Sequence, residues 1–101
     1  MRVSTIKKLQ ETYGLKQMQD MINSGQAWKM EGSYGRAAMG HLESGACMLP
    51  KERHNDYYGN TVPSRDDLKE GTKGTFQNSV RFWTAVQNGD IEMEVEDGDD
   101  F

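Results

Sequence analysis

Four glycines divide this chain into short segments that carry apolar residues at helical spacing. They stand at Gly14, Gly25, Gly45 and Gly89, each at the end of such a segment. Glycine commonly ends a helix because it adopts the left-handed backbone of the position after the C-cap without a steric penalty. The sequence therefore predicts four short helices, with Thr75 as the N-cap of the last. They span residues 5–13, 15–23, 34–44 and 76–88.

The segments between these helices are predicted to be extended or irregular. Residues 26–31 fit a short extended link or a single helical turn. The apolar run 46–49, closed by Pro50, predicts a buried extended segment. Residues 50–74 contain both prolines and many turn residues, which predicts a long loop. Residues 91–96 alternate between apolar and acidic side chains, as a half-buried strand does.

These elements predict a mainly α fold: four short helices around a small core, a long loop at 50–74 and a C-terminal β-strand. An α+β fold is the alternative. The length suits one domain, residues 1–96, followed by an acidic disordered tail, residues 97–101. Only 35% of the residues are apolar, so nine aromatic side chains must supply much of the core. A thin core also favours a homo-oligomer, because a second copy would cover apolar surface.

Charge is distributed unevenly along the chain. Twelve Lys and Arg and nine acids precede Gly89, a net +3, whereas seven acids and no cation follow it, a net −7. The acidic end fits a solvated terminus, an edge strand with Ile91, Met93 and Val95 facing inward, or an acidic surface for a basic groove on a partner. Direct nucleic-acid binding is not expected, because the acidic end would repel phosphates.

The compartment is inferred from the cysteine content and from the absence of targeting signals. The chain has one cysteine, Cys47, which excludes an intrachain disulfide and indicates a reducing compartment such as the cytoplasm. No apolar run follows the charged residues 1–8, so no signal peptide is expected. No stretch approaches the about 20 apolar residues that span a bilayer, so no membrane association is expected.

Catalytic and metal-binding patterns are weak in this sequence. The ligand-type residues His41, Cys47, His54 and Asp56 lack the close spacing of a metal site. Cys47 has only apolar neighbours, which is typical of a buried hydrophobe and not of a nucleophile. We therefore expect no bound metal and no cofactor.

Two further polar motifs have ordinary structural explanations. The stretch 71–75 resembles part of a phosphate-binding loop, but its lysine precedes the second glycine, so a capped turn fits better. Asp66 and Asp67 are adjacent carboxylates in a predicted turn, where such groups mostly face water. No constellation places a nucleophile, a base and an oxyanion donor together, so the chain is not expected to be an enzyme.

The best candidate for a functional site is an aromatic loop. Tyr57 and Tyr58 are adjacent in a stretch bounded by Gly and Pro and followed by Arg65, and interfaces are enriched in Tyr, Trp and Arg. We expect Trp83 to support binding at this site. The alternative is that one tyrosine covers the thin core and the other is half exposed.

Three runs carry a resemblance to small accessory proteins of bacteriophages and prophages: residues 31–39, 45–50 and 56–65. Such proteins are short, acidic and often bind host machinery. The resemblance implies a bacterial host protein as partner and the bacterial cytoplasm as location, and it implies no catalytic residue.

We therefore expect a non-enzymatic phage-type accessory protein that binds a host protein through the aromatic loop, the acidic tail or both. One alternative is a nucleotide or small-ligand binder that sequesters its ligand. Its pocket would combine the turn 71–75, Arg65 and the stacked tyrosines. The other alternative is a structural or assembly protein of the virion.

Overall fold

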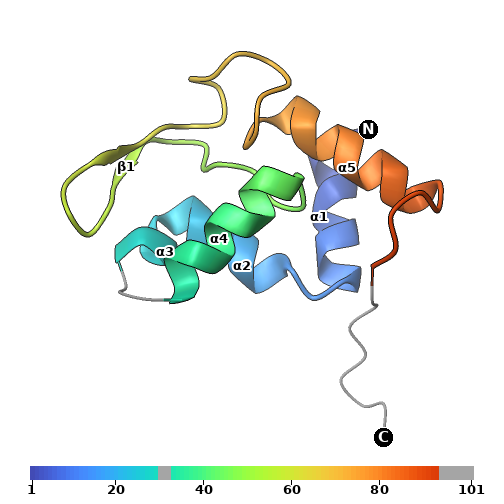
Figure 1. Ribbon diagram of the computed structural model, residues 1–101, viewed down its shortest axis with the longest axis horizontal. Coiled ribbons are helices and arrows are strands. Elements are labelled where there is room, and N and C mark those ends of the chain that lie inside the picture. The colour runs from blue at the N-terminus through green and yellow to red at the C-terminus, as the bar shows by residue number, and fades with distance from the viewer. Residues whose placement is uncertain (30–32, 94–101) are drawn as a thin grey trace, which may run out of the picture.

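The helices end where the glycines predict. The computed structural model describes residues 1–29 and 33–93. Gly14, Gly25, Gly45 and Gly89 all have positive φ angles, between 78° and 99°. The helices are α1 (Val3–Thr12), α2 (Lys16–Ser24), α3 (Gln26–Lys29), α4 (Ser33–Ser44) and α5 (Phe76–Gln87) (Figure 1). The mainly α prediction is confirmed.

Two predicted boundaries change in the structure. α1 begins at Val3, two residues before the predicted start, and residues 26–29 form the single turn that was one of two options for this link. α5 has the predicted cap, because the Thr75 hydroxyl accepts a hydrogen bond from Asn78 N. The described part of the chain therefore holds five helices, four of them at the predicted places.

The predicted C-terminal strand does not form over the residues that are described. Residues 91–93 have no strand conformation, because the amides of Asp90 and Ile91 both donate to Ala85 O and turn the chain back at the end of α5. The rest of that strand, 94–96, and the predicted tail, 97–101, lie outside the described residues.

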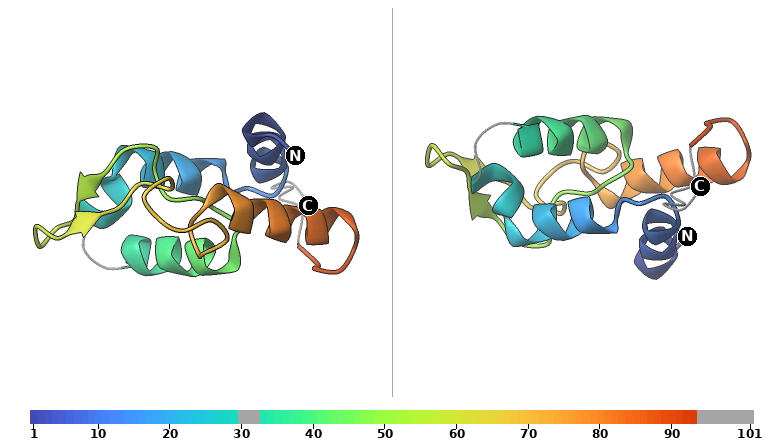
Figure 2. Two further views of the ribbon diagram at one scale, coloured as in Figure 1. Left: turned by 90° about the horizontal axis from the view of Figure 1, so that it is seen from above. Right: turned by 90° about the horizontal axis from the view of Figure 1, so that it is seen from below.

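A small antiparallel sheet lies instead inside the predicted long loop 50–74. β1 (His54–Asn55) pairs with β2 (Thr61–Val62), with His54 opposite Val62 and Asn55 opposite Thr61. This hairpin lies at the end of the molecule away from α5 in all three views (Figures 1 and 2). The remainder of 50–74 is irregular, as predicted.

The aromatic part of the core lies where α1 packs against α5. Trp83 is 0% exposed. Its ring lies 5.5 Å from that of Tyr13 and makes an edge contact with Phe82 at 5.0 Å. Trp83 and Val86 lie on one face of α5 at helical spacing, and Phe82 extends this buried face. Buried aromatic rings contribute large apolar areas, which compensates for the low apolar content of the chain.

A central segment that is neither helix nor strand, residues 45–50, runs through the middle of the fold with all six residues buried. It pairs with no strand, so side chains from the surrounding elements satisfy much of its backbone. Ser79 donates to Gly45 O at 2.7 Å, and Trp83 Nε1 donates to Ala46 O at 3.2 Å. Both donors lie on α5, so these bonds fix that helix to the central segment.

Two buried glutamines complete this arrangement. Gln10 Nε2 donates to Ala46 O at 2.9 Å and to Gln19 Oε1 at 2.8 Å. Gln19 in turn bonds to both backbone groups of Met48. Burial of an amide is unfavourable unless it is hydrogen-bonded, and here each amide has buried partners.

Candidate functional site

The predicted tyrosines lie at the tip of the β1–β2 hairpin, in a turn that is held by several hydrogen bonds. Asp56 Oδ1 accepts from Tyr58 N at 2.9 Å and from Asn60 N at 2.7 Å. Gly59 N donates to Asp56 O at 3.1 Å, and Gly59 has a φ of +85°. An aspartate that binds the backbone ahead of it and a left-handed glycine are typical of a rigid tight turn.

The hairpin is fixed to the corner between α2 and α3, both at β1 and at the start of its turn. Tyr57 N donates to Trp28 O at 2.7 Å, and His54 Nε2 lies 3.0 Å from Asn23 O. Gly25 allows this close approach, because a Cβ there would lie 2.7 Å from His54 Nδ1. The hairpin is therefore positioned by the helices beneath it and not only by its own two short strands.

This rigid hairpin exposes both tyrosine rings. Tyr57 is 56% exposed and Tyr58 is 81% exposed. Their centroids lie 5.1 Å apart at an interplanar angle of 74°, an edge-to-face arrangement that aromatic pairs favour. Neither ring covers the core, so the fold does not account for two large aromatic side chains at this position.

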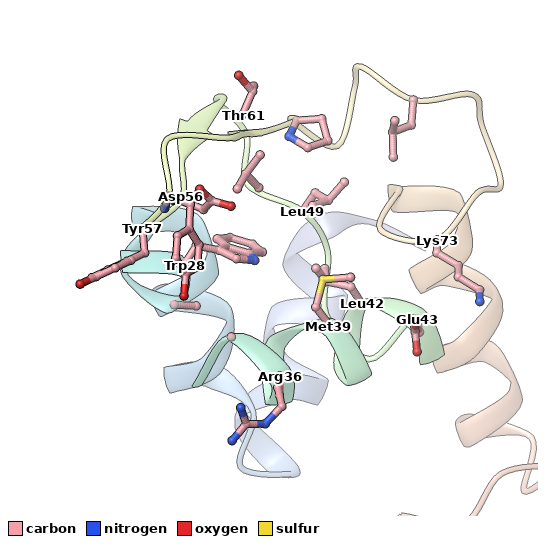
Figure 3. Close-up of a pocket in the computed structure, with 16 residues that line it drawn as sticks. Trp28, Arg36, Met39, Leu42, Glu43, Leu49, Asp56, Tyr57, Thr61 and Lys73 are labelled. Atoms are coloured by element: carbon pink, nitrogen blue, oxygen red, sulfur yellow. Dashed lines mark hydrogen bonds between the residues drawn. The ribbon is translucent and has the colours of Figure 1, made fainter. Parts of the chain in front are cut away.

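An open groove of about 940 Å³ separates the hairpin from α4 (Figure 3). We call it the hairpin–α4 groove. The Trp28 ring points into it from α3, and Met39 and Leu42 face it from α4. Leu49 of the central segment closes it from behind. Both tyrosines line it as well, together with Val62, Pro63 and Leu68.

Exposed apolar side chains concentrate at this groove. Within the described ranges, six large apolar or aromatic side chains are exposed, and four of them line the hairpin–α4 groove. These four are Met39, Tyr57, Tyr58 and Leu68. A contiguous exposed apolar surface on a small protein commonly marks an interaction site, whereas single exposed residues do not.

The groove is lined by charged residues of both signs. Arg36 and Lys73 are cationic, and Glu43 and Asp56 are anionic. Arg36 points away from the groove (Figure 3), and Asp56 is engaged in the turn. The groove therefore selects by apolar contact more than by charge.

The other two predicted site residues lie elsewhere. Arg65 is 8% exposed and donates to Leu49 O at 2.8 Å and to Asn23 Oδ1 at 3.1 Å. Trp83 is buried in the core against Tyr13 and Phe82. Neither lines the hairpin–α4 groove. Both side chains donate a hydrogen bond to a backbone carbonyl of the central segment, Arg65 to Leu49 O and Trp83 to Ala46 O.

Sequence reasoning missed most of the groove, including Trp28, Met39 and Leu68. Met39 carried a detectable signal, because it is a large apolar residue in the predicted helix 34–44. Trp28 and Leu68 carried no signal of their own, since their positions depend on how α3 and the long loop pack.

The thiol of Cys47 is buried and stays protonated at neutral pH. It is fully buried, and burial raises its pKa to about 12. A thiol in that state stays protonated and is a poor nucleophile.

The other polar residues that were considered as catalytic or metal-binding candidates either bond to neighbouring residues or lie far from one another. Asp67 accepts from Arg53 Nε at 2.7 Å and Nη2 at 3.0 Å and from Ser64 N, bonds that lower the pKa of this carboxyl. In the turn 71–75, the Thr75 hydroxyl caps α5 and donates to Thr72 O. Among residues 1–29 and 33–93, no three His, Cys, Asp or Glu side chains lie close enough to hold a metal ion.

None of the helices in the described ranges is both long and apolar enough to cross a bilayer. Comparison of the chain with known protein families, with curated proteins and with solved structures finds no match.

Proposed function

We propose that this chain is a non-enzymatic binding protein whose hairpin–α4 groove takes an apolar segment of a partner protein. The observation that carries the proposal is the tyrosine pair, which is held rigidly by a hydrogen-bonded turn and yet left exposed. A preorganised aromatic pair gives contact area with little loss of side-chain entropy on binding.

The occupant that fits this groove is a protein segment with one large apolar side chain as an anchor. Trp28 and Leu42 form the floor that would receive it, and Met39 can adapt its shape to it. Tyr58 extends beyond the groove, so it would contact the surface that surrounds the anchor. A buried anchor ringed by aromatic contacts is typical of interface hot spots.

The resemblance to phage accessory proteins makes a bacterial host protein the proposed partner, met in the host cytoplasm. The acidic tail was the other predicted contact, and it lies outside the described residues. Of the two predicted contact surfaces, only the aromatic loop at the groove therefore supports the proposal.

Photo-crosslinking in bacterial lysate, followed by affinity measurement with the purified partner, tests the proposal. A crosslinker placed at Tyr58 captures the partner, and calorimetry then compares variants. Tyr58→Ser and Met39→Ser each weaken binding by at least about tenfold. Tyr34→Ser, which changes an exposed tyrosine of α4 outside the groove, changes it by less than about twofold.

The proposal fails if Tyr34→Ser weakens binding as much as the groove variants do, or if the groove variants bind like the wild type. Capture of a second copy of this chain would instead favour the homo-oligomer and the virion-assembly alternative. Gel filtration at high concentration would then show a dimer or larger species.

A small ligand is the second candidate, because about 940 Å³ lies within the range of small-molecule pockets. Of the residues in the pocket predicted from the sequence, Tyr57, Tyr58 and Lys73 line the groove, whereas Arg65 and Gly71 do not. A thermal-shift series with nucleotides separates the two candidates. A specific ligand would raise the melting temperature of the wild type by mass action, and Met39→Ser would remove the rise.

A further inference from the structure

A second cavity, of about 300 Å³, lies on the other side of the central segment. Met48 lines it, whereas the next residue, Leu49, lines the hairpin–α4 groove. These consecutive residues line different sites, so the two sites are separated by the backbone of this segment. They share no lining residue. We call this second site the Arg65 cavity.

Arg65 lines this cavity as a buried cation without a carboxylate partner. It is 92% buried, and its two side-chain hydrogen bonds go to neutral oxygens, Leu49 O and Asn23 Oδ1. The ion pairs of the described chain are Lys16–Asp20 and Arg53–Asp67, and neither includes Arg65. A guanidinium has five N–H groups, so these two bonds leave donors for a further acceptor. A buried charge is unfavourable unless it is paired.

The rest of the cavity adds positive charge instead of a counter-ion. Lys7 reaches it from α1, and Lys51 reaches it from the residue after Pro50. Glu52 is the one acid among the lining residues. Asp66, the residue after Arg65, is exposed and does not line the cavity, although its negative charge acts on Arg65 and raises the pKa of that side chain against the larger lowering by burial. Three cations against one acid form a local positive site in a chain of net charge −4.

Asn23 supplies a further donor of defined orientation. Its Oδ1 accepts from both Gln19 Nε2 at 3.0 Å and Arg65 Nη2 at 3.1 Å. Two donors on one atom identify that atom as the oxygen. The amide nitrogen of Asn23 therefore remains a donor, and Asn23 is one of the residues that line the cavity.

We propose that the Arg65 cavity binds a phosphate group, either as inorganic phosphate or as the phosphoryl group of a small metabolite. Arg65 and the Asn23 amide donate hydrogen bonds to its oxygens, and Lys7 and Lys51 balance its charge. Guanidinium and phosphate match in geometry and form charge-assisted bonds. A dianion also supplies a direct ion pair for Arg65, which no carboxylate of the described residues forms. The proposal does not rest on the proposed protein-binding function.

An NMR titration of the nitrogen-labelled chain tests this inference. Inorganic phosphate is added at constant ionic strength, with sodium chloride as the reference titration. We expect a saturable shift of the Arg65 Nε–H signal and of the Met48 and Lys51 amides. Lys7→Gln and Lys51→Gln change exposed side chains, so the fold stays intact. Each weakens phosphate binding by about three- to tenfold.

Lys69→Gln is the matched control, because Lys69 is exposed and lines none of the cavities. It leaves the phosphate affinity unchanged. Glycerol phosphate and acetate are titrated in the same way for comparison. Tighter binding of glycerol phosphate than of inorganic phosphate assigns the site to a metabolite, and the reverse order assigns it to the free ion.

Three results would overturn the proposal. The first is an equal shift with chloride, which would indicate ionic strength alone. The second is acetate binding as tight as phosphate binding, which would remove the phosphate assignment. The third is full phosphate affinity in the double variant Lys7→Gln/Lys51→Gln.

Discussion

The side-chain amide of Gln19 pairs with the backbone of Met48 as a neighbouring strand would. Gln19 Oε1 accepts from Met48 N at 2.9 Å, and Gln19 Nε2 donates to Met48 O at 2.9 Å. The two residues lie 29 positions apart, one on α2 and the other in the central segment. A helix thus satisfies the backbone of a segment that has no strand beside it.

Replacement of this glutamine is expected to destabilise the fold. Gln19→Leu keeps similar bulk but leaves both backbone groups of Met48 buried without partners, at a cost of about 2–4 kcal/mol. Gln17→Leu, at an exposed position of the same helix, changes the free energy of unfolding by less than about 0.5 kcal/mol. Urea unfolding followed by circular dichroism measures both. Equal stability of Gln19→Leu and the wild type would contradict the pairing.

Two glycines are expected to respond to alanine with opposite signs. Gly25→Ala forces a left-handed backbone on alanine and places its Cβ against His54, so it destabilises by about 1–3 kcal/mol. Gly40 lies inside α4 with no atom within 4 Å of the added Cβ. Gly40→Ala therefore stabilises by about 0.5–1 kcal/mol. Thermal denaturation of the two variants tests the prediction, which fails if both shift stability in the same direction.

Substitution of the exposed tyrosines is expected to affect stability far less than substitution of the buried tryptophan. Tyr57→Ser and Tyr58→Ser are expected to change the free energy of unfolding by less than about 0.5 kcal/mol, since neither ring covers the core. Trp83→Ala removes a fully buried side chain and costs about 3–5 kcal/mol. Chemical denaturation distinguishes them. A loss above about 2 kcal/mol for either tyrosine would assign it to the core and remove it from the proposed site.

The buried thiol predicts a specific loss of stability at high pH. The pKa of Cys47 is raised to about 12 in the native state from an ordinary value of 9.0. Above pH 9 the unfolded chain releases this proton and the native chain retains it, so unfolding is favoured as pH rises. The slope is about 1.4 kcal/mol per pH unit between pH 9 and the native pKa.

Cys47→Ala isolates this effect from the titration of lysines and tyrosines. The difference in unfolding free energy between wild type and variant is expected to be constant below pH 9 and to shrink above it. A difference that stays constant up to pH 10.5 would show that the native thiol ionises normally. Reaction with a thiol reagent at pH 8 is likewise expected to be slow until denaturant is added.

Local chemistry alone determined where the helices end and which stretch is buried. The glycines after the apolar stripes, the Thr75 cap and the apolar run 46–49 act through steric preference, hydrogen bonding and hydrophobicity of neighbouring residues, which the sequence shows directly. These features predict a mainly α fold, and the local composition alone marks Tyr57 and Tyr58 as site residues.

Tertiary structure decided which polar side chains enter the core. Gln10, Gln19 and Arg65 are buried because a central segment without a partner strand needs donors and acceptors from α1, α2 and the long loop. The hairpin forms within 50–74, and Trp28 reaches the groove, because segments distant in sequence pack against one another. Such pairings depend on the whole fold, and no local pattern of the chain encodes them.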